Sequence, residues 1–212
     1  MQVMKWSVMA LAIAAATSQM AYADEQDDAM VKENVSSQAA SNGFIEDADF
    51  TLLNRNFAFY RNNIGNASDE QNYRNEWAHG FMTTFTSGFT QGVVGFGVDA
   101  FGNVGLKLNS GAGTSGTGLL PIQGDGQGQD EYSIAGGAVK ARVSETVLAF
   151  GQQRPQSPVF GTSDARLLPS YATGTTIASD EISGLHFQGG YFYSGSGENS
   201  TNQDGELKTV YG

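Results

Sequence analysis

Apolar and polar positions alternate over one long stretch of the chain, residues 90–109. Its even-numbered positions carry no charge, whereas the odd-numbered positions hold both charges, Asp99 and Lys107, and all the amide side chains. Because successive side chains of a strand point to opposite faces, this pattern predicts one long strand with one apolar face. Strands in soluble sheets usually have about 5–6 residues, whereas a tilted strand crosses a bilayer in about 9–11. The stretch fits a membrane-spanning strand, although a long hairpin of a soluble β-sandwich would also show this pattern.

The same period of two predicts six more strands and the start of an eighth. No proline falls within any of them, as expected because proline cannot donate a ladder hydrogen bond. Long connections alternate with short ones, which is typical of outer-membrane barrels and has no reason to occur in a sandwich. The predicted strands comprise residues 50–60, 75–86, 90–109, 131–143, 146–153, 175–182, 185–194 and the incomplete 206–212.

Two cationic side chains identify the face of the sheet that should line an aqueous lumen. Lys140 and Arg142 are two residues apart, so they share one face of the fourth predicted strand. On the lipid side either would cost about 2–4 kcal/mol at the bilayer midplane. The first strand is less regular, because an inward Arg55 turns Asn54 and Asn56 outward.

The chain begins with a segment typical of an export signal. Residues 1–23 contain a basic n-region, a short apolar core and a small-x-small cleavage site that ends at Ala23. Residues 24–43 are acidic and polar, and we expect them to form a flexible periplasmic lead or a short plug-like tail. Residues 44–212 then form the barrel part. The apolar core of the signal is too short for a spanning helix, so membrane insertion is expected through strands.

Composition and isolated motifs exclude several other functions. The chain has 22 acidic residues against 11 basic ones, which argues against a nucleic-acid partner. It has no cysteine, so disulfides, thiolate metal sites and cysteine nucleophiles are excluded. Residues 111–116 match GxGxxG, but no helical pattern follows as a nucleotide site requires. The acidic residues of the next loop lack EF-hand spacing. We therefore expect no enzymatic activity, no metal and no cofactor.

Four blocks of residues resemble one protein family: 76–81, 87–102, 115–121 and 163–169. They are similar to the OprD family of substrate-specific outer-membrane porins of pseudomonads, and the block SGFTQGVVGFGVDAFG is the most specific. The resemblance implies an all-β, antiparallel up-and-down barrel of 18 strands in the outer membrane of Gram-negative bacteria. It implies a monomer or weak trimer, acting as a passive channel for carboxylate-bearing nutrients such as amino acids or aromatic and organic acids.

The resemblance also implies a constriction, formed by an inward-folded third outer loop, and a ladder of basic side chains. A row of cations in a narrow channel focuses field lines, and several weak sites let an anion leave again. Each cation could instead only neutralise a luminal acid. Expected constriction residues are Pro155, Pro158, Asp164, Arg166 and Pro169; ladder candidates are Arg55, Lys107, Lys140, Arg142, Arg154 and Arg166.

The chain departs from the family pattern in its length. Seven complete strands and part of an eighth are fewer than the 18 expected, and each unpaired edge group costs several kcal/mol in hydrocarbon. We therefore expect the chain to be the N-terminal part of a longer porin that would not form a pore by itself. Expected partners are outer-membrane lipid and small anionic or zwitterionic solutes. The alternative is a secreted soluble β-protein that binds a ligand through its loops.

Overall fold

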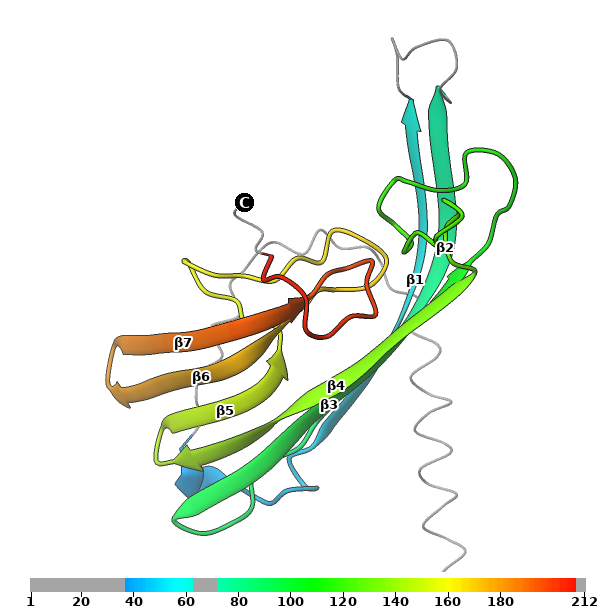
Figure 1. The fold of residues 1–212 in the computed structure, drawn as a ribbon. Helices are drawn as coiled ribbons and strands as arrows, with labels where there is room; N and C mark the ends of the chain where they lie inside the picture. The colour runs from blue at the N-terminus through cyan, green and yellow to red at the C-terminus, as the bar shows by residue number, and fades with distance from the viewer. Residues whose placement is uncertain (1–36, 63–71, 209–212) are drawn as a thin grey trace, which may run out of the picture. The chain divides into compact units, whose positions relative to one another are not determined.

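The structure is a computed structural model that describes residues 37–62 and 72–208. Its seven strands form one antiparallel sheet in which each strand pairs with its neighbours in sequence (Figure 1). Within these ranges, no helix has the length and apolar character needed to cross a membrane. The elements are η1 (Gln38–Ala40), β1 (Asp49–Asn62), β2 (Tyr73–Thr86), β3 (Val94–Lys107), β4 (Glu131–Val143), β5 (Thr146–Gln153), β6 (Tyr171–Ile182) and β7 (Leu185–Ser196).

The sequence predicted these strands closely. β4 and β5 have the predicted bounds, β6 begins four residues earlier than predicted, and β3 begins four residues later. There the Thr90 hydroxyl accepts a hydrogen bond from the N–H of Phe96 at 2.9 Å, and the Thr90 N–H donates to the Phe96 carbonyl at 2.9 Å. These bonds close a loop before β3. An eighth strand at 206–212 is wrong for residues 206–208, which lie outside any strand. The rest of it, the signal and residues 24–36 lie outside the described residues.

Loop length is segregated between the two ends of the sheet, as predicted. The β3–β4 and β5–β6 connections occupy residues 108–130 and 154–170. The β4–β5 and β6–β7 connections are two-residue turns, Ser144–Glu145 and Ser183–Gly184, and the β2–β3 connection is residues 87–93. We name the two ends of the sheet the long-loop end and the short-turn end.

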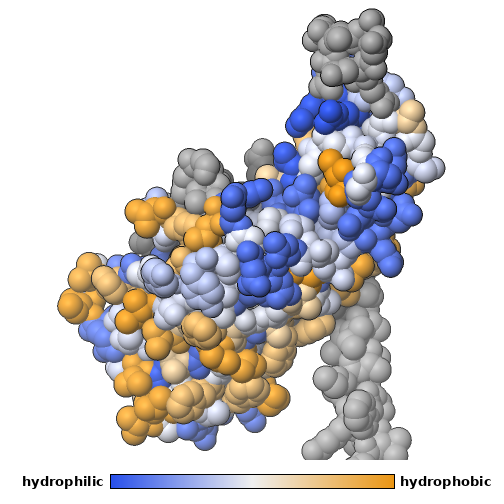
Figure 2. Space-filling model, viewed as in Figure 1, coloured by the Kyte–Doolittle hydropathy of each residue, from blue (hydrophilic) through white to orange (hydrophobic). Residues whose placement is uncertain are grey.

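One face of the sheet, here called the outer face, is apolar and exposed. In the register, Val98 of β3 pairs with Val139 of β4, which pairs with Phe150 of β5. Val139 is 59% exposed although it lies within a central strand. Figure 2 shows hydrophobic residues gathered over the strands and hydrophilic residues over the loops at the long-loop end. Further exposed apolar side chains of this face are Phe50, Leu52, Phe81, Val94, Phe96, Leu148, Ile177, Phe187 and Tyr191.

The opposite, inner face holds the buried core, because the two longest described loops fold back onto it. Leu119 and Leu120 of the 108–130 loop and Leu167 and Leu168 of the 154–170 loop are almost completely buried. Beneath Leu167 the sheet presents glycine: a Cβ at Gly105 would lie 2.9 Å from the Leu167 Cδ2 atom. The core is completed by Ala78, Met82, Tyr132, Ile134 and Tyr171.

Candidate functional site

Arg55 of β1 clamps the 154–170 loop to the inner face. Its Nη1 and Nη2 atoms donate to the two carboxylate oxygens of Asp164 at 2.7 and 3.1 Å. Nη1 also donates to the carbonyls of Arg166 and Leu167 at 2.6 and 3.3 Å. A planar guanidinium suits this bidentate geometry, which an ammonium group could not reproduce. Arg55 therefore pairs with the charge of Asp164 and also holds the backbone of the loop against β1.

Asp164 is shared between two arginines. Arg154 Nη2 lies 3.1 Å from the second oxygen of this carboxylate. The Arg55, Asp164 and Arg154 side chains remain 24%, 34% and 38% exposed, so water reaches all three. Arg166 lies nearby, with its guanidinium carbon 5.0 Å from the centre of the Phe59 ring. The Glu198 carboxylate accepts hydrogen bonds from the Ser163 hydroxyl and the Ala165 N–H at 2.9 and 2.5 Å. Three cations and two anions give this cluster a net positive charge, and we call it the upper site.

Lys140 and Arg142 form a second cationic cluster, the lower site, on the same face at the short-turn end. Lys140 Nζ lies 2.6 Å from the Asp99 carboxylate. Both cations lie over the ring of Phe89, at 5.1 and 4.2 Å from its centre, which stabilises them by cation–π interaction. Arg142 is only 5% exposed, and its Nε donates to the side-chain oxygen of Gln38 at 2.8 Å.

Gln38 was missed by the sequence reasoning. The described part of the expected flexible lead, residues 37–43, contacts the inner face through it. The buried Gln38 amide donates to the carbonyls of Thr90 and Gly92 at 2.8 and 3.2 Å, and its backbone N–H donates to Ser144 at 2.7 Å. No alternation or motif marks this residue in the sequence. It orients Arg142 while also holding the 87–93 connection.

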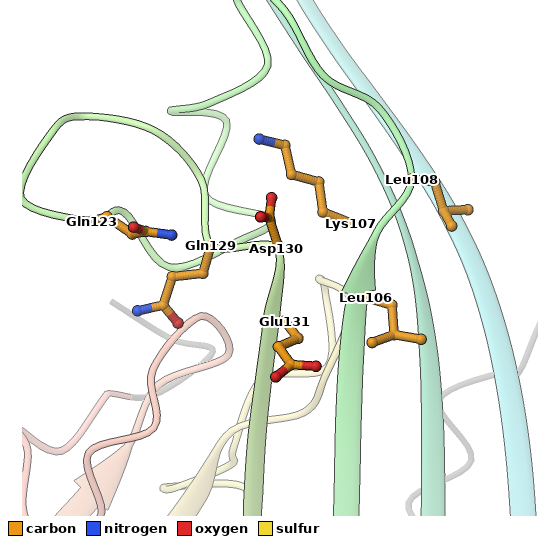
Figure 3. A pocket seen from close by; sticks show the side chains of 7 residues that line it. All are labelled: Leu106, Lys107, Leu108, Gln123, Gln129, Asp130 and Glu131. Carbon is orange, nitrogen blue, oxygen red and sulfur yellow. The ribbon is translucent and has the colours of Figure 1, made fainter.

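Lys107 lies apart from both clusters, at the rim of the long-loop end. Its Nζ donates to the carbonyl of Gly128 at 3.3 Å, and its backbone N–H donates to the backbone carbonyl of Asp130 at 2.8 Å. An open cavity of about 720 Å³ has Lys107 among its lining residues, together with the acidic Asp130 and Glu131 (Figure 3). Lys107 therefore faces acidic neighbours at this rim, whereas the upper site has an excess of cations.

The prolines expected in the constriction loop occupy different environments. Pro169 is buried next to the leucine core, whereas Pro158 is exposed. Pro155 helps to line a smaller cavity of about 270 Å³, in which Phe160 stacks on Phe192 of β7 with 4.8 Å between ring centres. The first half of the loop thus lies against β7, and the second half against β1 and β2.

The two histidines have polar neighbours but no metal-binding arrangement. Across residues 37–62 and 72–208, no group of three or more His, Asp or Glu side chains could hold a metal ion. His79 lies 3.3 Å from the Asn56 amide on the outer face, and Asn56 accepts a hydrogen bond from Trp77 at 2.8 Å. This contact explains how an outward asparagine is tolerated in β1. His186 pairs with Asp180 at 2.6 Å.

Comparison with known proteins finds one family. A family profile described as "outer membrane porin, OprD family" matches residues 42–212. Porin D of Pseudomonas aeruginosa is 46% identical over 211 residues, which cover 100% of this chain and 45% of that protein. The porin-like protein GalP of Pseudomonas putida is 42% identical over 173 residues, covering 81% of this chain and 42% of that protein. The chain thus spans less than half the length of these curated relatives.

Solved structures show the same fold. The chain matches OccK9 (OpdG) of P. aeruginosa with a TM-score of 0.71 and 40% identity, over 76% of this chain and 41% of that one. It matches a BenF-like porin of Pseudomonas fluorescens with a TM-score of 0.71 and 42% identity, over the same shares. For OccAB1 of Acinetobacter baumannii the values are 0.72 and 31%, over 79% and 39%. The predicted all-β antiparallel barrel part is confirmed.

Proposed function

Because the chain belongs to the OprD family of outer membrane porins, we propose that it forms part of a passive, substrate-selective channel for small carboxylate-bearing nutrients. Its location is the outer membrane of Gram-negative bacteria, where the apolar outer face of β1–β7 contacts lipid. Family membership removes the alternative of a secreted soluble protein. Proteins of this family are channels, so the proposal includes no catalytic step.

The observation that supports carboxylate selectivity is the placement of two cationic clusters on the inner face. The upper site lies under the 154–170 loop, and the lower site lies near the short turns. At the upper site three cations, Arg55, Arg154 and Arg166, outnumber two acids, Asp164 and Glu198. At the lower site Lys140 and Arg142 face Asp99 and Asp47, so the charges there balance. In a channel with low-dielectric walls, the net positive charge of the upper site raises the local concentration of anions.

The exposure of the cations argues for transport and against tight binding. At the upper site water screens the partly exposed ion pairs, so each exchange of partner costs little. A solute carboxylate can therefore compete with Asp164 for Arg55 or Arg154. Two weak sites in series favour entry without trapping the solute, which is what conduction requires. This role would make the 154–170 loop the constriction of the channel.

The class of solute is limited by the chemistry of the upper site. A guanidinium pair recognises a carboxylate, and the neighbouring Phe59 ring provides apolar contact area. OpdK of P. aeruginosa, 39% identical to this chain, was crystallised with vanillate, an aromatic carboxylate. Amino acids and aromatic or organic acids all present the required group, and we propose this class as the substrates.

The proposal can be tested by conductance in planar bilayers with pores that contain this chain. We expect Arg166→Ala and Arg142→Ala each to lower the anion-to-cation permeability ratio, because each removes one inner-face cation. Lys208→Ala is the matched control, because it removes one exposed charge outside every strand. Unchanged ion selectivity in both arginine variants would overturn the proposal.

A further inference from the structure

Glu76 of β2 is a completely buried carboxylate at the base of the 108–130 loop. One of its oxygens accepts hydrogen bonds from the N–H of Thr117 at 2.7 Å and of Leu119 at 3.4 Å. The hydroxyl of Thr117 donates to the same oxygen. The other oxygen is buried and has no hydrogen-bond partner among the described residues. A carboxylate is rarely buried unless it is well hydrogen-bonded. The burial of Glu76 therefore indicates that its hydrogen bonds to the loop have a specific role.

Glu76 belongs to a short segment of β2 that contacts the 108–130 loop at several points. The neighbouring N–H of Asn75 donates to the Gly113 carbonyl at 2.7 Å. Arg74 Nη1 donates to the Gly116 carbonyl at 2.8 Å. The side chain of Glu76 then holds Thr117 and Leu119 from within. Three consecutive residues of one strand thus fix the conformation of the loop just before its buried leucines.

The buried leucines couple the position of the 108–130 loop to that of the 154–170 loop. Leu119 and Leu120 belong to the same core cluster as Leu167 and Leu168 of the 154–170 loop. All four side chains are 0–1% exposed, so none can shift without opening a void or displacing the others. Leu167 directly follows Arg166 in the sequence, and both carbonyls accept from Arg55. The placement of Arg166 at the upper site therefore depends on where the leucine pair of the other loop lies.

We propose that Glu76 is a positioning residue for the upper site, acting through the 108–130 loop on the 154–170 loop. It fixes Thr117 and Leu119, which set the leucine core, and the core fixes the height of Arg166 above the sheet. Glu76 itself contacts none of the three arginines through any described hydrogen bond or ion pair. This inference rests on the proposed function for its effect on selectivity, but not for its effect on the loops.

The first test measures the loops and does not depend on transport. Spin labels at Ile122 and Val159, both exposed in the two loops, report the distance between them by double electron–electron resonance. Glu76→Ala should broaden and shift this distance distribution, because the 108–130 loop loses its inner anchor. Glu76→Gln keeps an acceptor oxygen for Thr117, so it should retain the wild-type distribution. Glu131→Ala, which removes an exposed acid at the start of β4, is the control.

The second test uses selectivity in a double-mutant cycle. In a wild-type background Arg166→Ala should lower the anion-to-cation permeability ratio, which is the test of the proposed function. In a Glu76→Ala background the same change should have less than half that effect, because Arg166 is already displaced. Thr117→Val keeps the carboxylate and removes one donor, so it provides a milder variant if Glu76→Ala does not fold. An unchanged distance distribution or an undiminished Arg166 effect in the variant that folds would overturn the inference.

Discussion

At the scale of single residues, Asp164 has two opposing effects on the attraction of anions to the upper site. Its carboxylate neutralises part of the upper site, and it also fixes Arg55 and Arg154 at 2.7 and 3.1 Å. We expect Asp164→Asn to raise the anion-to-cation permeability ratio by about one and a half- to fivefold, because exposed ion pairs are worth about 0.2–1 kcal/mol. The reversal potential in a salt gradient measures this ratio. Asp125→Asn, in the exposed part of the 108–130 loop, is the control.

The opposite outcome at Asp164 would also be informative. If the substitution lowered the anion preference, the carboxylate would act mainly by holding the two guanidiniums in place. Two contacts argue against this result: Arg55 keeps its hydrogen bonds to the Arg166 and Leu167 carbonyls without Asp164, and water can replace Asp164 at the partly exposed Arg154.

Asp47, just before β1, makes the free energy of unfolding depend on pH, and the sign of this dependence follows from its hydrogen bonds. The side-chain amide of Asn42 donates to one of its oxygens at 2.7 Å and the Asn42 N–H to the other at 2.8 Å. These bonds lower the pKa of Asp47 below its ordinary value of 3.8. Its contribution to stability is therefore complete above pH 3.8 and is lost as the pH falls through the lowered pKa. Asn42→Ala should raise this pKa, and an NMR titration of the carboxyl carbon would measure it; an unchanged pKa would contradict the assignment.

At the scale of elements, the packing of the 154–170 loop depends on the bare backbone of β3. A Cβ at Gly105 would meet Leu167 at 2.9 Å and would approach the Tyr132 ring more closely still. We expect Gly105→Ala to lower the free energy of unfolding by about 1–3 kcal/mol, as overpacking does. It should also lower single-channel conductance, because a loop pushed away from the sheet extends further into the lumen. In Gly124→Ala no described atom lies within 4 Å of the new Cβ, and this control should change neither quantity.

The sequence predicted the strands better than the site, for a physical reason. Alternation is a local signal, and lipid on one face requires it along every strand, so β4 and β5 were predicted to the residue. The partners of the inner-face charges are distant: Arg55 meets Asp164 across 109 positions, and Glu76 meets Thr117 across 41. Alternation places Glu76 on the inner face but carries no information about which loop covers it.

At the scale of the whole molecule, net charge and local charge have opposite signs. The chain carries a formal charge of −11, which by itself would repel anions. Its proposed anion preference must therefore come from where the cations lie. Screening favours this explanation, because the Debye length is about 8 Å at physiological ionic strength. Acids that lie farther than this from the inner-face cations then have little influence on a solute that has reached the inner face.

The division into an apolar outer face and a charged inner face is the property on which a channel depends, and adjacent residues of β4 can test it. Val139 is 59% exposed on the outer face, whereas Lys140 points to the inner face and pairs with Asp99. We expect Val139→Arg to lower the free energy of unfolding in lipid vesicles by about 2–4 kcal/mol if the residue lies at the midplane, and less toward the interface. Val93→Arg places the same charge at an 84% exposed position in the 87–93 connection, where water can solvate it, and should cost little. Equal stability of the two variants in lipid would mean that the outer face of β4 does not contact hydrocarbon.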